Sequence, residues 1–209
     1  CFDFHTHTLF GIDHGVQERS LFKELLVEYK KNGFDTLVCT PHLYHPLVST
    51  NVSKIRENFL LASEDAKKVG LRLVLGCELY VGSQLELKAI PVGGKYCLCE
   101  FNPKSKPMGL DRKLKQLKDQ GFEVVIAHVE RYSWLNPSCE EFQKLMEMDC
   151  LVQVNVSGIE RKTALPYLEK GLVDIISSDN HGDLTLPQRL RKCIDSYPDV
   201  AFRMESMKI

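Results

Sequence analysis

The sequence predicts an α/β protein built around a parallel sheet, and three observations favour this fold class. Apolar segments rich in Val, Ile, Leu, Phe and Cys alternate with amphipathic, helix-like segments. Most apolar segments lack the polar alternation of a strand with one solvated face. No Ser/Gly/Pro-rich linker, charge block or repeat divides the 209 residues, so we expect one domain over residues 1–209. These patterns fit either an open doubly wound sheet or a closed barrel.

Seven apolar segments are the predicted strands. They cover residues 2–7, 36–42, 71–80, 96–101, 124–130, 151–156 and 174–181. The predicted helices lie between them at residues 18–32, 53–69, 110–120, 138–148, 162–170 and 187–196. Glycines at 33, 70 and 121 predict the ends of the first three helices. Ser138 with Glu141 predicts a capping box, and Thr185 predicts the cap of the last helix.

Composition excludes several classes of function. Lys plus Arg number 27 and Asp plus Glu number 28, a net charge of −1 that leaves no basic footprint for nucleic acid. No apolar run approaches the ~18 residues of a membrane span, and no signal peptide is recognisable. The eight cysteines form no Cys-x-x-Cys pair, so we expect buried free thiols in a reducing compartment and a cytoplasmic protein.

Two common kinds of phosphate chemistry are also disfavoured. The thirteen glycines include neither Gly-x-Gly-x-x-Gly nor Gly-x-x-x-x-Gly-Lys, the loops that cradle nucleotide phosphates. A cysteine-nucleophile phosphatase needs an Arg six residues after its Cys, and no cysteine of this chain has one. We therefore expect no thiol catalysis.

Potential metal ligands gather where the predicted strands end. Six of the seven segments finish on His, Asp or Glu, and α/β folds place their active sites at the carboxyl ends of strands. His5 and His7 are two residues apart and so share one face of a strand, as do Asp179 and His181. His42, Glu78, Glu100 and His128 end further strands. So many imidazoles and carboxylates at one edge would repel or desolvate one another without cations, which predicts a polynuclear metal site.

The residues after these strands also form a recognisable motif set. The segments DFHTHT, TPH, GCELY, LCEF, IAHVERY and SSDNH resemble those of the PHP superfamily, named for polymerase and histidinol phosphatase domains. GIDHG, IAHVERY and VNVSG resemble most the branch of bacterial manganese-dependent protein-tyrosine phosphatases from capsule and exopolysaccharide operons. The resemblance runs from residue 3 to residue 181 and implies a distorted (β/α)7 barrel of the TIM-like type.

The resemblance further implies a trinuclear site for divalent ions, with Mn expected and Fe or Zn as alternatives. By position, His5, His7, Glu78 and Asp179 would hold the first ion. Glu78 would bridge to a second ion shared with Glu100 and His128, and His14, His42 and His181 would hold the third. Arg131, beside His128, would bind the substrate phosphate.

Two positions depart from the pattern of that branch. The branch usually has Asp-Asp-Gly where this chain has Asp13-His14-Gly15, so the third ion loses one negative charge. The branch tends to carry an Arg before a Pro shortly after its Asp-x-His motif, and this chain has Leu186 there. Arg189 is then a displaced candidate for a second phosphate contact, and His45 a candidate for loop or substrate contact.

The predicted function is hydrolysis of phosphotyrosine in proteins, linked to capsule or exopolysaccharide synthesis, with a bacterial tyrosine kinase as a possible substrate. Water activated by the ions would attack phosphorus while Arg131 binds two phosphate oxygens, so that Arg131, His128 and Asp179 form the catalytic set. The alternatives are a phosphatase of the same fold acting on a small phosphomonoester such as histidinol phosphate, a regulatory domain without catalysis, and an amidohydrolase-type enzyme. The last usually needs a ligating Lys at a strand end, which this chain lacks.

Overall fold

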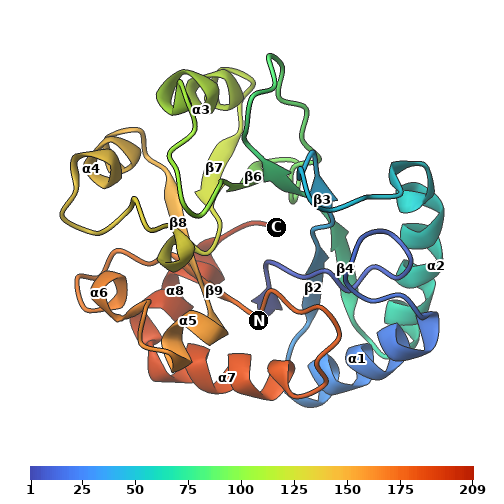
Figure 1. The fold of residues 1–209 in the computed structure, drawn as a ribbon. Helices are drawn as coiled ribbons and strands as arrows, with labels where there is room; N and C mark the ends of the chain where they lie inside the picture. The colour runs from blue at the N-terminus through green and yellow to red at the C-terminus, as the bar shows by residue number, and fades with distance from the viewer.

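Parallel strands curled into a ring form the centre of the computed structural model, which describes residues 1–209 (Figure 1). One section of the sheet consists of β1 (Phe2–Asp3), β2 (Thr36–Cys39) and β4 (Arg72–Leu75). The other contains β3 (His42–Leu43), β5 (Glu78–Tyr80), β6 (Tyr96–Glu100), β7 (Glu123–Ile126), β8 (Leu151–Asn155) and β9 (Ile175–Ser177), in that order. Every paired strand runs parallel to its neighbour.

The segment after β1 joins the two ends of this curled sheet. A parallel bridge links Thr6 to Asn180, beyond β9. His7 N donates to Asn180 O (2.9 Å), and Asp179 N donates to His5 O (2.9 Å). The sheet is therefore a distorted barrel, as expected, and the residues that follow its first and last strands lie side by side.

Two of the predicted strands are each broken in the middle. Residues 36–42 divide into β2 and β3 because Pro41 has no N–H to give to a ladder. Residues 71–80 divide into β4 and β5 around Gly76, where a Cβ would lie 2.4 Å from Val92 Cγ2. Each break moves the chain from the first section of the sheet to the second, which is how seven predicted strands become nine.

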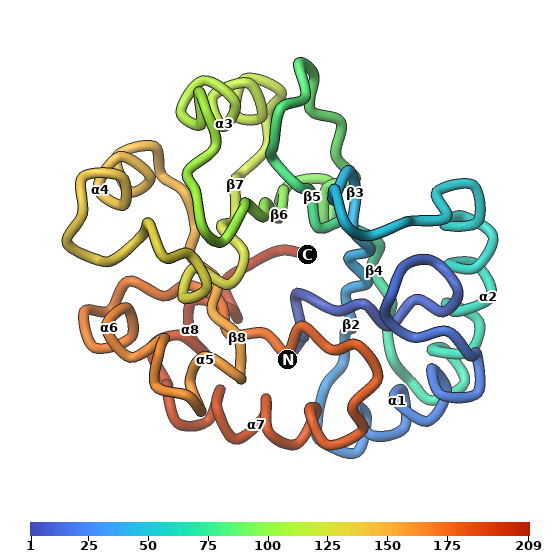
Figure 2. The backbone as a smooth tube through the Cα atoms, viewed as in Figure 1, coloured from blue at the N-terminus to red at the C-terminus, as the bar shows by residue number.

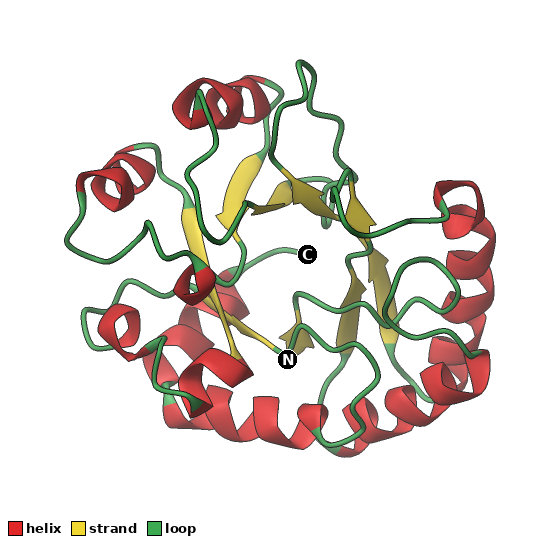
Figure 3. Cartoon of the chain, in the orientation of Figure 1, coloured by secondary structure: helices red, strands yellow, loops and turns green.

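Helices cover the outside of the ring (Figure 3). They are α1 (Arg19–Lys31), α2 (Ile55–Lys68), α3 (Leu110–Asp119), α4 (Glu140–Glu147), α5 (Val156–Glu160), α6 (Leu165–Leu168), α7 (Leu186–Ser196) and α8 (Pro198–Ser206). Short 3-10 turns η1 (Val52–Lys54) and η2 (Val129–Arg131) precede α2 and follow β7. Apolar side chains of the helices pack on the sheet in one continuous core. No helix is both long and apolar enough to cross a membrane.

The helix predictions fail in four places. The cap of α4 is Cys139, whose Sγ accepts from Phe142 N (3.4 Å), so the capping box predicted at Ser138 is wrong. α5 and α8 were not predicted, although Pro198 at the start of α8 is a typical helix signal. The helix expected over residues 162–170 forms only as α6, which starts next to Pro166.

A buried carboxylate ties the start of the barrel to its helices. Asp3, fully buried on β1, accepts hydrogen bonds from the Tyr29 hydroxyl of α1 (2.7 Å) and from the backbone N and the hydroxyl of Ser178 (3.1 Å for the N). The backbone N of His5 is a further donor, at 3.4 Å. Both carboxylate oxygens of Asp3 therefore accept hydrogen bonds, as a buried polar group requires.

The last residues of the sequence lie at the opposite end of the barrel, where the strands begin. Arg72, the first residue of β4, donates from Nη2 to Ile209 O (2.7 Å). The backbone tube in Figure 2 shows this last segment crossing toward the middle of the ring.

Candidate metal centre

The nine side chains predicted as metal ligands meet at the carboxyl ends of the strands. Each lies in ring or ion-pair contact with another member of the set. Seven are buried, His181 is partly exposed and His14 is exposed. The buried members are His5, His7, His42, Glu78, Glu100, His128 and Asp179. Sequence reasoning therefore found the cluster, although which ions these residues bind stays a prediction.

Glu78 is the centre of the cluster. Its Oε2 lies 3.2 Å from His5 Nε2, 3.1 Å from His7 Nε2 and 3.1 Å from His42 Nδ1. None of these three contacts has hydrogen-bond geometry, so this buried oxygen has no donor. Its Oε1 does pair with His128 Nε2, at 2.7 Å. Burial alone would raise the pKa of Glu78, but the charge of His5 and the hydrogen bond from His128 hold that pKa well below its usual range.

The hydrogen-bond partners of Nδ1 in His5 and His7 determine whether Nε2 of each ring carries a proton or a lone pair. His7 Nδ1 contacts Asp13 Oδ2 (2.8 Å), and His5 Nδ1 contacts the Oε1 of Gln153 (3.3 Å). Both partners are acceptors, which assigns the ring proton to Nδ1 in each neutral imidazole. The two Nε2 atoms, 3.2 Å apart, then direct lone pairs at each other and at Glu78.

Such an arrangement requires a positive charge between the rings. Without a metal ion a proton takes this role: burial lowers the pKa of His7, but the hydrogen bond to Asp13 and the contacts with Asp179 and Glu78 outweigh it and raise that pKa well above its usual range. Protons and metal ions compete for the same lone pairs. Imidazole nitrogens and a carboxylate oxygen that lacks a donor are the ligand set that suits transition metals, so the residues fit a divalent ion.

His42 and Glu100 form a second part of the cluster. His42 Nδ1 lies 2.9 Å from Glu100 Oε1, and both side chains reach Glu78 to form one of the groups able to hold a metal. Burial, with the charge of Glu78, raises the pKa of Glu100 to about 9, while burial and the charge of His7 lower the pKa of His42 to about 4. Both shifts favour the neutral forms of the pair, and a bound cation would favour the ionised carboxylate.

The third part of the cluster consists of histidine rings packed near His42. The rings of His42 and His181 lie 4.3 and 4.2 Å from that of His7, and these three histidines form one potential metal-binding group. His181 Nε2 is buried without a hydrogen-bond partner. His14 belongs instead to a group with His42 and Asp13. The predicted set of His14, His42 and His181 is thus split between two groups, and Asp13 restores the carboxylate that His14 lacks.

Asp179 lies between the histidines and Arg131. Its Oδ1 is 3.4 Å from both His5 Nε2 and His7 Nε2, and its Oδ2 accepts from Arg131 Nη2 at 2.7 Å. The side chain of Arg131 is 46 % exposed, and its guanidinium reaches the edge of the cluster at Asp179. Arg131 forms no ion pair with its neighbour Glu130, which turns inward and accepts from Asn155 N at 3.0 Å.

The backbone is strained at two of these positions. His128 has a φ of 32° and Asp179 a φ of 54°, in the left-handed region that side chains other than Gly rarely adopt. Each such residue costs about 1–2 kcal/mol. Strain of this kind persists where the surrounding contacts over-determine it, which is typical of functional sites. Here it turns both side chains toward Glu78 and the histidines.

The sequence analysis did not identify two side chains of β8, Gln153 and Asn155, that hydrogen-bond to the predicted ligands. Gln153 accepts from His128 N (2.8 Å) with the same oxygen that faces His5, and its amide N donates to Asn155 Oδ1 (2.7 Å). Asn155 Nδ2 in turn donates to Asp179 Oδ2 (3.0 Å). These amides lie two residues apart inside an apolar strand, so they share a face. A buried polar pair in an otherwise apolar strand was the available signal.

Two predicted substrate contacts differ from Arg131. Arg189 forms a forked ion pair with Glu160, with Nε 2.8 Å from Oε1, and a second contact with Asp183 (3.0 Å). Its donors are occupied, so this conformation does not offer them to a phosphate. His45 stays beside the cluster, with its ring 5.1 Å from that of His42 and 5.2 Å from that of Tyr80.

Comparison with known proteins identifies the family. The family model described as capsular polysaccharide synthesis, CpsB/CapC, matches residues 1–201. This chain belongs to the CpsB/CapC family. Among curated CpsB/CapC relatives, the tyrosine-protein phosphatase CpsB of Streptococcus pneumoniae is 32 % identical over 92 % of this chain and 88 % of its own length. The tyrosine-protein phosphatase YwqE of Bacillus subtilis is 24 % identical over 86 % of this chain and 76 % of its own length.

Solved structures confirm the fold of this CpsB/CapC member. A crystal structure from work on YwqE of Bacillus subtilis and CpsB of Streptococcus pneumoniae, described as unique metal-dependent tyrosine phosphatases, superposes with a TM-score of 0.78. It is 20 % identical and covers 98 % of this chain and 86 % of the other. Histidinol phosphate phosphatase of Lactococcus lactis, solved with zinc, L-histidinol and phosphate, gives 0.56 at 12 % identity, covering 94 % and 93 %. The barrel is therefore of the PHP type.

Proposed function

We propose that this chain is a metal-dependent protein-tyrosine phosphatase that acts in capsular or exopolysaccharide synthesis. The observation that carries the proposal is the buried cluster around Glu78, where imidazole lone pairs and a carboxylate oxygen without a donor converge. Membership of the CpsB/CapC family and 32 % identity with a tyrosine-protein phosphatase support this activity. A cluster of this kind has no structural use that an apolar core would not serve better.

Three divalent ions, with Mn as the expected metal, would be held by the nine predicted ligands, and Asp13 adds a tenth candidate. When bound, such ions supply positive charge for a phosphate dianion and lower the pKa of water. Glu78 is placed to serve more than one ion, because its two oxygens contact different histidines. Gln153, Asn155 and Asp13 hold the inner residues in the required tautomer and orientation.

Arg131 is the proposed substrate-binding residue. Its planar guanidinium can bind two phosphate oxygens in a fork, a geometry that Lys cannot reproduce. Asp179 anchors one side of the guanidinium through Nη2, and the exposed side remains free to approach a ligand. His45 and Tyr80, in edge-to-face ring contact (74° between planes), provide a surface beside the cluster where an aromatic substrate ring could pack.

Substrate class separates this proposal from its rival, a phosphatase for a small phosphomonoester such as histidinol phosphate. The metal-loaded protein is assayed with free phosphotyrosine, phosphotyrosine peptides, phosphoserine peptides and histidinol phosphate, and its metal content is measured by mass spectrometry. We expect kcat/KM to be highest for phosphotyrosine compounds. A higher value for histidinol phosphate, or hydrolysis that persists after removal of all metal, contradicts the proposal.

The role of Arg131 is tested by Arg131→Ala and Arg131→Lys. We expect kcat/KM for phosphotyrosine to fall by on the order of 10²-fold in the Ala variant, and the Lys variant to recover only part of it, since the fork is lost. Metal content should stay at the level of the unsubstituted protein. Loss of metal in Arg131→Lys would instead indicate that Arg131 positions the metal ligands.

Thiol chemistry is tested separately. Five of the eight free cysteines are buried, and no thiol is hydrogen-bonded to a predicted metal ligand. A chelator should abolish activity, and iodoacetamide should change it less than about twofold. Strong inactivation by iodoacetamide together with indifference to chelator would restore a cysteine mechanism.

The remaining proposals concern setting and partner. Eight free cysteines without a disulfide support a reducing, cytoplasmic location. A bacterial tyrosine kinase that carries phosphotyrosine is the proposed protein substrate. Dephosphorylation of such a kinase by the metal-loaded protein, followed with anti-phosphotyrosine antibody, tests this, and a kinase whose phosphotyrosine persists while free phosphotyrosine is hydrolysed excludes it as the partner.

A further inference from the structure

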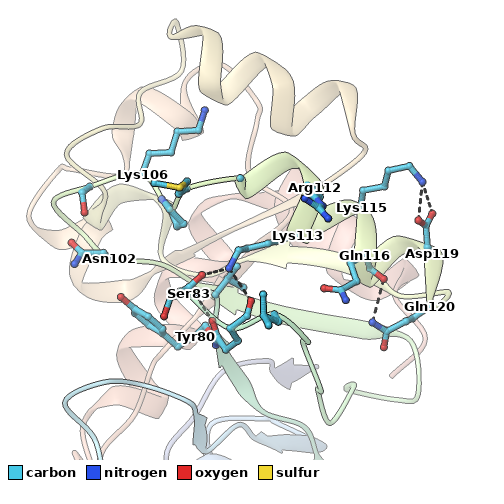
Figure 4. Close-up of a pocket in the computed structure, with 18 residues that line it drawn as sticks. Tyr80, Ser83, Asn102, Lys106, Arg112, Lys113, Lys115, Gln116, Asp119 and Gln120 are labelled. Atoms are coloured by element: carbon cyan, nitrogen blue, oxygen red, sulfur yellow. Dashed lines mark hydrogen bonds and ion pairs between the residues drawn. The ribbon is translucent and has the colours of Figure 1, made fainter.

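A groove of about 1140 Å³ opens beside the metal centre (Figure 4). One wall is the loop that follows β5, and the other is formed by residues 102–109 and α3. Tyr80 and Asn102 line it, each two residues beyond a predicted ligand, Glu78 and Glu100 respectively. Tyr80 also contacts His45, so the groove begins where the cluster ends. Its volume exceeds that of a typical small-molecule pocket, ~300–1,000 Å³, and is far more than one phosphotyrosine side chain needs.

The lining of this groove is cationic in a chain whose net charge is −1. Four basic side chains line it against one carboxylate, that of Asp119. Lys115 pairs with Asp119 at 2.8 Å, whereas Arg112 is exposed and makes no hydrogen bond or ion pair. Arg112 thus offers its full charge and all its donors to a ligand.

The other two lining cations differ in their partners. Lys113 directs its ammonium at the backbone carbonyls of Gly82 and Gln84 and has no carboxylate partner (Figure 4). Its charge is therefore not neutralised, and it also anchors the loop wall to α3. Lys106 contacts Glu141 of α4, at 3.3 Å. The groove keeps a surplus of positive charge from Arg112 and Lys113 together.

Apolar side chains stand on both rims of the groove. Leu85 on the loop wall is 95 % exposed, and Met108 on the opposite wall is 93 % exposed. Large apolar side chains this exposed on the two sides of one groove indicate a surface that another molecule covers. An inorganic anion or a sugar chain would leave them in water, whereas a peptide carries apolar groups that can pack between them.

We propose that this groove binds an acidic peptide segment next to the phosphotyrosine of the protein substrate. This inference rests on the proposed phosphatase activity and adds a substrate preference to it. Asp and Glu side chains of the segment would lie along Arg112 and Lys113, and an apolar residue would pack between Leu85 and Met108. The phosphotyrosine itself would reach the cluster past Tyr80.

The test compares two phosphotyrosine peptides of equal length. One carries Asp and Glu on both sides of the phosphotyrosine, and the other carries Asn and Gln at the same positions, so only charge differs. For the metal-loaded protein we expect kcat/KM to be about tenfold higher for the acidic peptide, the sum of a few exposed charge pairs. This ratio should shrink as salt rises, since exposed charges are screened over ~10 Å at 0.1 M ionic strength.

Two variants locate the preference. Arg112→Glu should bring the acidic-to-neutral ratio close to one. Lys67→Glu makes the same charge change on an exposed part of α2 and should leave the ratio at its original value. Because both peptides share the same reacting group, any change at the metal centre cancels in the ratio. Equal loss of the ratio in both variants would assign the preference to net charge and overturn the groove as its source.

The outcomes separate this inference from the proposed function. Hydrolysis of free phosphotyrosine with no preference between the two peptides overturns the groove proposal and leaves the phosphatase proposal intact. Failure to hydrolyse any phosphotyrosine compound overturns both. An acidic polysaccharide, polygalacturonate, is tested as a competitor against the unphosphorylated acidic peptide. Stronger inhibition by polygalacturonate at equal charge, lost in Arg112→Glu, would make a polysaccharide the occupant and contradict the peptide assignment.

Discussion

Two buried carboxylates on neighbouring parts of the barrel have opposite surroundings. Asp3, on β1, is fully buried and accepts from the hydroxyls of Tyr29 and Ser178 and from backbone N–H groups. Glu78, on β5, is equally buried, but its Oε2 faces three imidazole nitrogens and no donor. Burial raises the pKa of Asp3 above its ordinary value, while the pKa of Glu78 lies well below.

The difference distinguishes a structural carboxylate from one that fits a metal. A carboxylate surrounded by hydroxyl and amide donors needs no further partner, and removing it would leave those donors unsatisfied. A carboxylate surrounded by ring nitrogens whose protons are held elsewhere needs a cation. Substitutions at the two positions should therefore differ in their effect on metal binding.

The largest effect is expected for Glu78→Gln, which keeps the shape and removes the charge. Activity on free phosphotyrosine should fall by on the order of 10³-fold, because the charge that holds the ions is lost. Bound metal, counted by mass spectrometry, should fall with it. The thermal unfolding midpoint of the metal-free protein should fall as well, because the lowered pKa of Glu78 means that its charge stabilises the folded protein through His5 and His128. A variant that keeps both its metal and its activity would refute the central role of Glu78.

A smaller effect is expected one layer further out, at Asp13. In the unsubstituted protein, Asp13 Oδ2 lies 2.8 Å from His7 Nδ1. Asp13→Asn replaces this charged hydrogen-bond acceptor with a neutral one. Changes to such supporting groups typically cost about 10–100-fold in metal affinity. Titration of the metal-free variant with Mn should show this loss, with activity recovered at saturating Mn. Unchanged affinity would mean that the tautomer of His7 is set by the cluster alone.

At Asp3 the effect should be on folding instead. Asp3→Asn leaves one amide group facing donors and should cost about 1–3 kcal/mol of unfolding free energy. For a chain of this size each kcal/mol lowers the thermal midpoint by ~2–4 °C. Metal content per folded molecule should match the unsubstituted protein. Loss of metal at full stability would place Asp3 in the metal centre and break the comparison.

The smallest effect belongs to Tyr29→Phe, which removes a single donor from Asp3. A hydrogen bond to a buried charge contributes ~1.5–3 kcal/mol, and Ser178 remains to satisfy the carboxylate, so we expect a decrease of about 1 kcal/mol in urea unfolding. Metal affinity should not change. A larger loss than that of Asp3→Asn would show that the hydroxyl serves Ser178 and Asn180 more than Asp3.

Helix α1 was easier to predict than the strand breaks. α1 matches its prediction within one residue at each end, because a stripe of Leu and Tyr and a terminal Gly are local signals. The strand breaks at Pro41 and Gly76 occur where the chain crosses from one section of the sheet to the other. At Gly76 the reason is tertiary, because a Cβ there would clash with the side chain of Val92. The cap of α4 lies one residue later than predicted, because Cys139 Sγ rather than the Ser138 hydroxyl accepts from the first turn, at Phe142 N.

The sequence by itself determined the α/β class, the family and the nine clustered side chains, because strand direction places the ends of parallel strands together and the motifs follow those ends. Tertiary structure alone decided the rest. Closure between Thr6 and Asn180, the occupied donors of Arg189 and the basic groove beside Tyr80 all join segments far apart in the chain. Local periodicity carries no information about such contacts, so only the folded chain reveals them.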